Sequence, residues 1–518
     1  MRGASDRGWW KLPALSGALL GTSYMPGPLL PLNLTAFLPL LAWLHANPDA
    51  DGRTRLKVGF VFGLVAHLIT LHYMYSMLVF SWLASLLYVA TAVTLALRIS
   101  ISIVLLGWLR RRTGLSFALL LPIVWLPMEW VQTWGDLRFT GDHLYHSMGG
   151  YPFVVQFADL VGPYGVGAFL LVVNGLLFEA LALRGERRGR RAALALALVW
   201  IAALAYDGWA WTREEPRDET LRVALVQPNI PLAVKHDAAT AAEQWRTLVR
   251  LSEEAAEQGA ELIVWPESAR PRPLYHKPEM PETYAMAEVQ ALARRIGVPL
   301  LVGVEYVRLQ DGGVYELYNA AMAVDAEGRL LPEWGAKVYL VPFTEAVPFE
   351  RLVGPLVEGK GGEWQWVAGG FTPGPELALL DVADSRVGVL VCYEQLFPDL
   401  PRGLRNSGAE LQVVITNDAW WGRSFLQLWQ ANALRLRAIE NRTAFVRVAN
   451  TGISGFVDSR GRYHRRTALF EEAVEVHEVG RSSRLTVYNR IGDLVAWLAI
   501  GGLIAAVVTA RSGATAGR

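Results

Sequence analysis

Cysteine is almost absent from this sequence, because Cys392 is the only one in 518 residues. A single cysteine excludes an intrachain disulfide, and the chain has no CxxC pair or Cys/His cluster of the kind that binds structural zinc. A structural zinc site is therefore not expected, and we also expect no other metal ion and no cofactor. The number of cysteines does not identify the compartment, so location has to be inferred from other features.

An excess of charge of either sign is also missing. The chain has 49 Lys and Arg against 48 Asp and Glu, which gives a formal net charge of +1. Proteins that bind nucleic acid usually carry a clear basic excess. The sequence therefore gives no reason to expect a nucleic-acid partner.

Apolar residues are plentiful but unevenly distributed. The chain is 52% hydrophobic with a mean hydropathy of +0.24, which is richer than a typical soluble protein. Long apolar stretches dominate residues 12–211, residues 213–488 have the composition of a soluble domain, and residues 491–510 are apolar again. We expect an N-terminal membrane domain at 1–212, an α/β domain at 213–488, and a C-terminal transmembrane helix with a cytoplasmic tail at 489–518.

The apolar stretches are numerous and long enough to exclude the buried helices of a soluble protein. A membrane-spanning helix needs about 20 mostly apolar residues, because lipid offers no partner to an exposed backbone. Seven stretches precede the soluble domain and an eighth follows it: 11–24, 29–46, 57–76, 80–109, 115–134, 162–183, 192–211 and 491–510. The first is short and could instead be a signal peptide, although no A-x-A-like cleavage site is evident and more spans follow.

Basic residues are concentrated in alternate connections between these stretches. They occur at both termini and in the second, fourth and sixth connections, at Arg2, Arg7, Lys11, Arg53, Arg55, Lys57, Arg110, Arg111, Arg112, the five arginines of RGERRGRR, Arg511 and Arg518. The connections near 25–28, 77–79 and 135–161 contain only Arg138. Since cytoplasmic loops carry the excess of Lys and Arg, both termini are expected inside and residues 213–488 outside.

Two histidines, His67 and His72, lie inside the third expected span. Polar residues within a span are often functional. Histidines near the outer end of a span can also simply meet lipid headgroups, so both interpretations stay open.

Apolar, β-branched runs alternate with helical patterns in residues 213–488. Strands are expected at 221–227, 261–267, 299–307, 317–325, 386–394, 411–418 and 444–452, and helices at 238–259, 282–296 and 427–441. Several of these strands are apolar on both faces, which is typical of a sheet covered by helices. The fold class expected here is α/β.

Three expected strand ends carry reactive side chains. Glu267 follows LIVWP, Lys337 and Glu345 lie in EWGAKVYLVPFTEAVPFE, and Cys392 ends the run VGVLVC. A thiol can attack a carbonyl as its thiolate, a carboxylate can take its proton, and an ammonium group can stabilise the negative charge that develops. Taken singly, each has a simpler interpretation: a buried core thiol, a turn carboxylate and a surface lysine.

These segments also resemble a known family. LIVWPES, the Lys337 segment and VCYEQLF resemble the three motifs of the nitrilase superfamily. The segments VQPNIP, PFTEAVPFE, NDAWWG and RVANTGISGFVDSRG, with PMEW and DLVGPYGV in the apolar half, look like the apolipoprotein N-acyltransferases, the membrane-bound branch of that superfamily. The resemblance covers essentially the whole chain and implies a multi-span helical membrane domain plus an αββα sandwich.

The resemblance implies a role for each site residue. Cys392 would attack the ester of a phospholipid and become a thioester, Glu267 would be the general base, and Lys337 would stabilise the tetrahedral intermediate. Glu345 would support the site. Tyr393 and Glu394 match residues that matter for the second half-reaction, and Trp420 would lie near the acyl-binding mouth or in the core.

The resemblance also implies partners and a location. The acyl donor would be a membrane phospholipid and the acceptor a diacylglyceryl-modified lipoprotein, whose free α-amine receives the chain as an amide. The protein would be a monomer in the bilayer of the bacterial inner membrane, multi-pass, with its catalytic domain on the periplasmic face. Residues 350–370, rich in Gly and Trp, suggest a lid.

Several segments depart from the family pattern, and other functions remain open. His236 stands where many members have tryptophan, FTGDHLYHSMGG replaces the usual F-x-GFPW pattern, and the helix at 427–441 lacks a histidine that some members have. The same residues could serve a membrane-tethered amidase or an acyltransferase that uses another amine. A noncatalytic scaffold and a transporter are further alternatives, although a transporter offers no use for the outer Glu, Lys and Cys.

Overall fold

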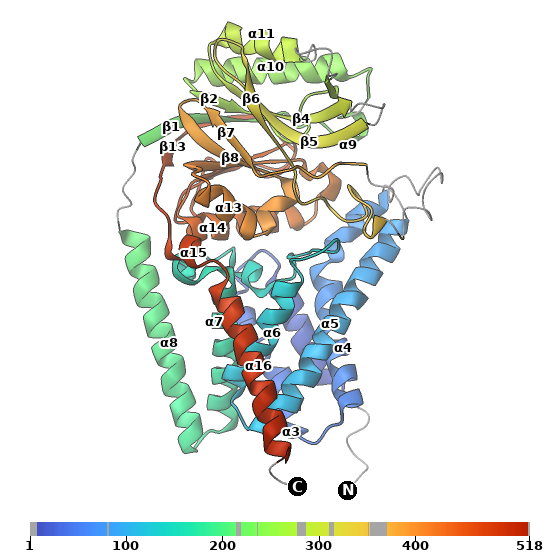
Figure 1. Ribbon diagram of the computed structural model, residues 1–518, viewed down its shortest axis with the longest axis vertical. Helices are drawn as coiled ribbons and strands as arrows, with labels where there is room; N and C mark the ends of the chain where they lie inside the picture. Colours follow the sequence, from blue (N-terminus) through green and yellow to red (C-terminus); the bar gives the residue numbers. More distant parts are fainter. Residues whose placement is uncertain are drawn as a thin grey trace. The chain divides into compact units, whose positions relative to one another are not determined.

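The computed structural model describes residues 8–79, 82–213, 219–235, 237–276, 286–309, 315–350, 352 and 370–515. The chain forms two compact units, Met1–Arg213 with Ile491–Arg518, and Glu214–Arg490. The first unit is helical and the second contains the sheets (Figure 1). His236 and most of the expected lid, residues 351 and 353–369, lie outside the described residues.

The first unit contains helices in each of the expected apolar stretches. They are α1 (Lys11–Ser23), α2 (Leu30–Asn33), α3 (Leu38–Ala46), α4 (Gly52–Thr70), η1 (His72–Val79), α5 (Leu83–Thr113), α6 (Phe117–Val131), η2 (Leu144–Met148), η3 (Pro152–Val154), α7 (Ala158–Ala182), α8 (Arg187–Thr212) and α16 (Leu494–Thr515). Asp51 caps α4 by accepting from the Thr54 N–H at 2.8 Å, and α5 ends at Gly114 in the left-handed region.

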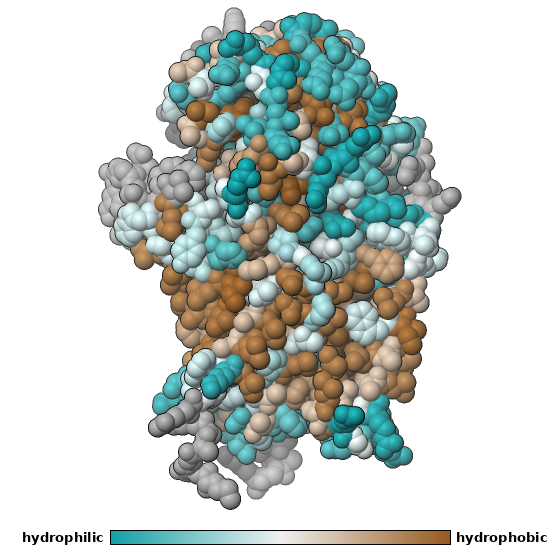
Figure 2. All heavy atoms as spheres, turned by 180° about the vertical axis from the view of Figure 1, so that it is seen from behind, coloured by the Kyte–Doolittle hydropathy of each residue, from teal (hydrophilic) through white to brown (hydrophobic). Residues whose placement is uncertain are grey.

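Four described helices, in α5, α7, α8 and α16, are long and apolar enough to cross a membrane. The pair α4 and η1, bent by 53°, adds a fifth if it is one span. The helices at 11–23, 30–46 and 117–131 are shorter. Apolar side chains gather over this unit's surface in Figure 2. Leu194 and Leu198 of α8 are among the exposed apolar residues of the unit. Eight spans therefore stay a prediction, of which four or five meet the requirements of length and composition.

The atypical FTGDHLYHSMGG segment is held by polar contacts within the first unit. The Asp142 carboxylate accepts one hydrogen bond from Gln132 at 2.8 Å and contacts His67 Nε2 at 3.1 Å, and it forms an ion pair with Arg98. His67 is 3% exposed, so of the two interpretations for this residue the headgroup contact is excluded. The ring of His72 instead contacts the Ile69 carbonyl at 2.7 Å on the surface.

The second unit is built on two mixed β-sheets. The first has the order β13-β1-β2-β4-β5-β6, with β3 beside β4, and the second has the order β12-β11-β10-β9-β8-β7. The strands are β1 (Glu219–Gln227), β2 (Leu262–Val264), β3 (Leu274–His276), β4 (Leu300–Leu309), β5 (Tyr315–Val324), β6 (Leu330–Ala336), β7 (Ala378–Val382), β8 (Ser385–Val391), β9 (Leu411–Thr416), β10 (Phe445–Ala449), β11 (Gly455–Val457), β12 (Tyr463–His464) and β13 (Ala473–Arg481).

Helices cover the outer face of each sheet and the inner faces pack together. The helices described in the second unit are α9 (Leu232–Lys235), α10 (Ala241–Glu257), α11 (Ala287–Ile296), η6 (Cys392–Leu396), α13 (Asp399–Asn406), η7 (Asp418–Trp421), α14 (Leu426–Asn441) and α15 (Val487–Ile491). Figure 1 shows α10 and α11 on one sheet and α13 and α14 on the other. The expected αββα sandwich is confirmed.

Side-chain alternation along the strands explains this layering. In β1, Val223 and Leu225 belong to the core between the sheets, whereas Ala224 and Val226 pack in the core beneath α10. Successive side chains of a strand point to opposite faces, so a strand with two apolar faces must be covered on both. Leu248 and Leu251 of α10 are spaced to lie on one helical face and supply part of that cover.

Candidate active site

Cys392 is the first residue after β8, where the backbone leaves the sheet in a left-handed conformation with φ +56°. Residues other than glycine rarely adopt this conformation, and those that do are often found at active sites. The Gln395 amide donates to the Cys392 carbonyl at 3.1 Å and holds the turn. The expectation that the strand continues to residue 394 is wrong, because the chain turns into η6 at the thiol.

Glu267 lies three residues beyond Val264, the last residue of β2, and is 7% exposed. Its Oε1 accepts from Asn319 Nδ2 of β5 at 2.6 Å, and its Oε2 accepts from the backbone N–H of Asn417, after β9, at 2.6 Å. Donors from both sheets therefore fix both oxygens of this carboxylate.

The backbone of Glu267 is also held. A Cβ at Gly303 of β4 would lie 2.2 Å from the Pro266 carbonyl oxygen, so only glycine allows this close approach. Lys235, which is 5% exposed, donates from Nζ to the Glu267 carbonyl at 3.0 Å. The sequence analysis did not identify Lys235 or Asn319. Each is a polar residue next to an apolar run, Lys235 in VQPNIPLAVK and Asn319 in LYNAAMAV, and this pattern could have indicated them.

Lys337 follows β6 and is 1% exposed. Its ammonium lies 2.8 Å from Glu345 Oε1, and the other oxygen of Glu345 accepts from the Val341 N–H at 2.8 Å. The Lys337 backbone donates to the Asn319 carbonyl at 2.9 Å. The alternative interpretation of Lys337 as a solvated surface charge is therefore excluded.

These charges act on the sulfur of Cys392. Burial, together with the carboxylates of Glu267 and Glu345, raises the pKa of the thiol to about 12, although Lys337 and Thr416 act in the opposite direction. The resting thiol is therefore neutral and needs a base to become a nucleophile. Glu267, Lys337 and Glu345 thus lie close enough to Cys392, at one end of the sandwich, to shift the pKa of its thiol.

The charge states of the Glu267 carboxyl group and the Lys337 ammonium group complement the neutral thiol of Cys392. Burial raises the pKa of Glu267, and this outweighs the opposing effect of Lys337, so its carboxylate is a stronger base than an exposed glutamate. Burial lowers the pKa of Lys337, but the neighbouring Glu345, Cys392 and Glu267 outweigh it, and the net pKa lies above the ordinary value. Lys337 therefore stays cationic at every physiological pH.

Glu394 ties the Lys337 segment to the turn that holds Cys392. Its carboxylate accepts from the N–H groups of Val338 at 2.6 Å, Tyr339 at 3.1 Å and Val391 at 2.8 Å. Burial raises the pKa of Glu394 to about 7 in spite of these donors.

The two expected aromatic residues differ in their surroundings. The ring of Tyr393 is buried and packs edge-on against Phe397, with ring centroids 4.8 Å apart. Trp420 is half-buried in η7, which begins after the Asn417 that binds Glu267. The roles expected of Tyr393 and Trp420 stay predictions.

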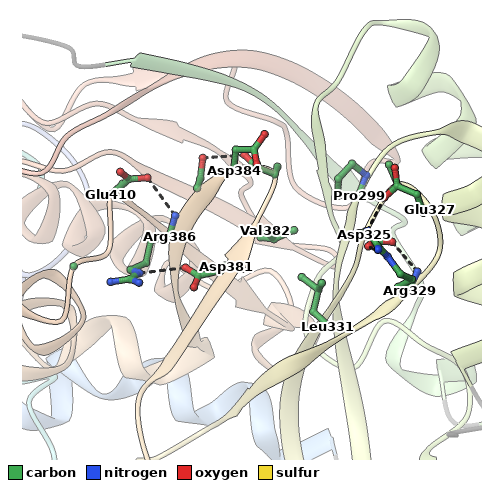
Figure 3. A pocket seen from close by; sticks show the side chains of 14 residues that line it. Pro299, Asp325, Glu327, Arg329, Leu331, Asp381, Val382, Asp384, Arg386 and Glu410 are labelled. Carbon is green, nitrogen blue, oxygen red and sulfur yellow. Dashed lines mark hydrogen bonds and ion pairs between the residues drawn. The ribbon is translucent and has the colours of Figure 1, made fainter.

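A separate pocket lies at the opposite end of the sandwich (Figure 3). It is lined by strand ends and turns at the end of the sheets away from Cys392, and its residues include Arg329, Asp381, Arg386 and Glu410. Arg386 pairs with Asp381 at 3.2 Å and its N–H reaches Glu410 at 3.2 Å. This pocket does not contain the Cys392 group, and among the described residues no cluster of three His, Cys, Asp or Glu is arranged to hold a metal ion.

The arrangement suits acyl transfer through a thiol. A buried neutral thiol lies beside a strengthened carboxylate base and a permanent cation, which are the three components that covalent attack on a carbonyl needs. The individual roles of Glu267, Lys337, Glu345 and Cys392 stay predictions.

Two family models match the chain. Residues 222–485 match the model described as carbon-nitrogen hydrolase, and residues 16–176 match the apolipoprotein N-acyltransferase N-terminal domain. Among solved structures, an amidase from the nitrilase superfamily of Nesterenkonia AN1 aligns with a TM-score of 0.37 at 20% identity, covering 51% of this chain and 92% of that one. A nitrilase-superfamily member of Saccharomyces cerevisiae aligns with a TM-score of 0.39 at 18% identity, covering 52% and 93%.

Curated relatives match over nearly their full length. An apolipoprotein N-acyltransferase of Geobacter metallireducens is 32% identical, covering 96% of this chain and 94% of the relative. Those of Chlorobaculum tepidum and Gloeobacter violaceus are 30% and 31% identical, covering 96% and 94% of this chain and 96% and 92% of the relatives. The chain belongs to the apolipoprotein N-acyltransferase family.

Proposed function

We propose that this protein transfers an acyl chain from a membrane phospholipid to the α-amine of the diacylglyceryl cysteine of an apolipoprotein, with Cys392 as the carrier. The observation that supports this most directly is the group of Glu267, Lys337 and Glu345 around the sulfur of Cys392, in a chain that aligns over 96% of its length with relatives of that name. No cofactor is needed, because the donor chain is already an ester.

The first half-reaction forms a thioester. Glu267 takes the proton of the Cys392 thiol as the sulfur attacks the ester carbonyl. Lys337, which remains cationic, stabilises the oxygen anion of the tetrahedral intermediate. The C–O bond then breaks, the lysophospholipid leaves as an alcohol with the proton from Glu267, and the acyl chain stays on sulfur.

The second half-reaction forms the amide. The neutral α-amine of the apolipoprotein attacks the thioester carbonyl, Glu267 takes one of its protons, and the C–S bond breaks. The thiolate of Cys392 recovers a proton from Glu267, so the enzyme returns to its starting state. Glu394 supports both steps by holding the Lys337 segment against the Cys392 turn. We assign Tyr393 and Trp420 to the space that the acyl chain and the acceptor occupy.

We also propose that the first unit spans the bacterial inner membrane and that residues 213–488 lie on its outer face. The distribution of arginine and lysine between alternate connections supports this orientation. Both substrates are anchored in a bilayer, so a catalytic domain joined to spans at both ends would meet them at the membrane surface. We expect a monomer that carries both half-reactions in one chain.

The experiment is an intact-mass measurement of the full-length protein in detergent with dipalmitoyl phosphatidylethanolamine as the donor. We expect a palmitoyl-sized mass gain that hydroxylamine removes, and no gain in Cys392→Ala. Adding a synthetic diacylglyceryl-cysteine peptide should return the enzyme to its original mass and add the acyl chain to the peptide. The same peptide with an acetylated α-amine is the matched control and should leave the thioester in place.

Absence of a mass gain in folded protein would contradict phospholipid as the donor. If the same preparation then hydrolyses short-chain amides, the membrane-tethered amidase is the correct function. If the thioester forms but the free-amine peptide does not discharge it, the donor is right and the acceptor is wrong.

A further inference from the structure

A hydroxyl group lies beside the nucleophile at the end of the neighbouring strand. In the parallel pairing of β8 and β9, Val391 at the end of β8 is opposite Ile415, so Cys392, where the chain leaves the sheet, follows directly beside the end of β9 at Thr416. The Thr416 side chain is fully buried and lies close enough to Cys392 for its hydroxyl to lower the pKa of the thiol. The only cysteine of the chain therefore has a hydroxyl partner that water does not reach.

The same hydroxyl contacts a buried ion pair on its other side. Thr416 Oγ1 donates to Asp418 Oδ1 at 2.9 Å. Asp418 is bound by Arg447, with Nη2 and Nη1 at 3.0 and 3.1 Å from Oδ2, and both side chains are fully buried. A Cβ at Gly452 would lie 1.9 Å from Asp418 Oδ2, so the backbone also confines this carboxylate.

A hydroxyl group has one proton to donate, so Thr416 cannot donate to Asp418 and to a thiolate at the same time. While the thiol is neutral, its S–H can donate to Thr416 Oγ1, which in turn donates to Asp418. When Cys392 loses its proton, the sulfur becomes an acceptor and the hydroxyl can rotate toward it. Asp418 does not lose its last partner in this rotation, because Arg447 still donates to both of its oxygens.

We propose that Thr416 is a catalytic residue whose hydroxyl accepts from the Cys392 thiol in the resting state and donates to the thiolate as it forms. The Asp418–Arg447 pair is the positioning element that holds the hydroxyl proton in the resting state. This inference rests on the proposed function only in taking Cys392 as the nucleophile. In this proposal the Thr416 hydroxyl group is a neutral hydrogen-bond donor, additional to the charged groups around Cys392, that turns toward the sulfur when the sulfur becomes negatively charged.

The test measures the rate at which iodoacetamide alkylates Cys392 in the full-length protein as a function of pH, followed by intact mass. The charged groups that face the sulfur, Glu267, Glu345 and Lys337, remain in every variant. Thr416→Val keeps the side-chain volume and loses the hydroxyl, whereas Thr416→Ser keeps the hydroxyl. We expect the midpoint of the pH profile to rise in Thr416→Val, with alkylation about tenfold slower at neutral pH, and to return close to wild type in Thr416→Ser.

Thr416→Ala is the second variant that lacks the hydroxyl, and it avoids crowding if valine disturbs the fold. An unchanged midpoint in either folded variant without the hydroxyl overturns the proposal, even if acyl transfer falls, because a purely structural role would lower activity without moving the titration. A midpoint that rises in Thr416→Ser as much as in Thr416→Ala overturns it too.

Alkylation needs no lipid, so the two proposals can fail separately. A raised midpoint in Thr416→Val with no thioester in wild type would leave the role of Thr416 standing and remove the phospholipid donor. A thioester in wild type with no change of midpoint in the variants would leave acyl transfer standing and remove the role of Thr416.

Discussion

The ammonium of Lys337 lies 2.8 Å from the carboxylate of Glu345, with 1% and 14% of the two side chains exposed. Lys337 is buried more deeply than its partner, so Glu345 is the group through which the pair meets solvent. Removing one member of a buried pair leaves the other without compensation. Glu345 therefore has two effects, since it keeps Lys337 in place and it also raises the pKa of the Cys392 thiol.

Glu345→Gln should slow thioester formation roughly a hundredfold, because Lys337 loses the group that positions it near the developing oxyanion. The glutamine oxygen can still accept from the Val341 N–H, so the loop should remain folded. The measurement is the rate of acyl-enzyme formation by intact mass. The matched control is Glu327→Gln, which changes an exposed carboxylate that pairs with Arg329 on the surface. Equal rates in the two variants would show that the ion pair does not position Lys337.

Glu394 should make the stability of the second unit depend on pH. Burial raises its pKa from 4.5 to about 7, so between these values the folded state binds more protons than the unfolded state. The free energy of unfolding should then fall as pH rises from about 4.5 to about 7. Glu267, whose pKa burial also raises, adds a slope of the same sign.

Glu394→Gln should reduce this slope in a series of Tm measurements on the full-length protein in detergent. It should also lower stability at pH 8 by about 2 kcal/mol, because one amide oxygen replaces a carboxylate that accepts from three backbone N–H groups. Glu254→Gln, on the exposed face of α10, is the control and should keep the wild-type slope. A Glu394→Gln slope identical to wild type would assign the titration to other groups.

The sequence predicts the layers of the second unit and the reactive residues of its site. The αββα sandwich follows from strands that are apolar on both faces, and Glu267, Lys337 and Cys392 were identified at strand ends. The turn at Cys392 was not foreseen, because an apolar run gives no sign of where the backbone leaves the sheet. One contact at this turn, the hydrogen bond from the Gln395 side chain to the Cys392 carbonyl, comes from a residue three positions further along.

Contacts made by the backbone are also invisible in the sequence. Glu267 is held by the N–H of Asn417, and any residue except proline carries such a donor. Asn319 contacts Glu267 only because β4 and β5 pair in one particular register. In the first unit, a segment with Asp142 replaces the F-x-GFPW pattern, and only the structure shows that Asp142 has partners on two helices.

Arg98 and Asp142 should be energetically coupled. Arg98→Met removes the arginine of the ion pair and leaves the Asp142 carboxylate buried beside His67 and Gln132. We expect this substitution to lower the free energy of unfolding by about 3 kcal/mol. Adding Asp142→Asn removes the uncompensated charge, so the double variant should be more stable than the Arg98→Met variant. Thermal unfolding of the four proteins in detergent gives the coupling energy. Additive losses would mean that the two side chains do not form a pair in solution.

Lys235 should affect Glu267, the proposed general base, in two ways: by holding its backbone and by lowering the pKa of its carboxyl group. Its Nζ donates to the Glu267 carbonyl at 3.0 Å, and its charge lowers the pKa of the Glu267 carboxyl. Lys235→Met keeps an unbranched buried side chain and removes both effects. The pKa of Glu267 should then rise further, so the acid limb of the pH–rate profile for thioester formation should move to higher pH.

The pH dependence of the free energy of unfolding tests the charge of Lys235 independently of the reaction rate. Burial lowers the pKa of Lys235 from 10.5 to about 8, so between these values the unfolded state binds more protons and the free energy of unfolding should rise with pH. Lys235→Met should lose this rise. Arg246→Met, which removes a cation from the exposed face of α10, should change neither profile. If Lys235→Met lowers the rate equally at all pH values, Lys235 only supports the backbone of Glu267. A shifted acid limb means that its charge also sets the strength of the base.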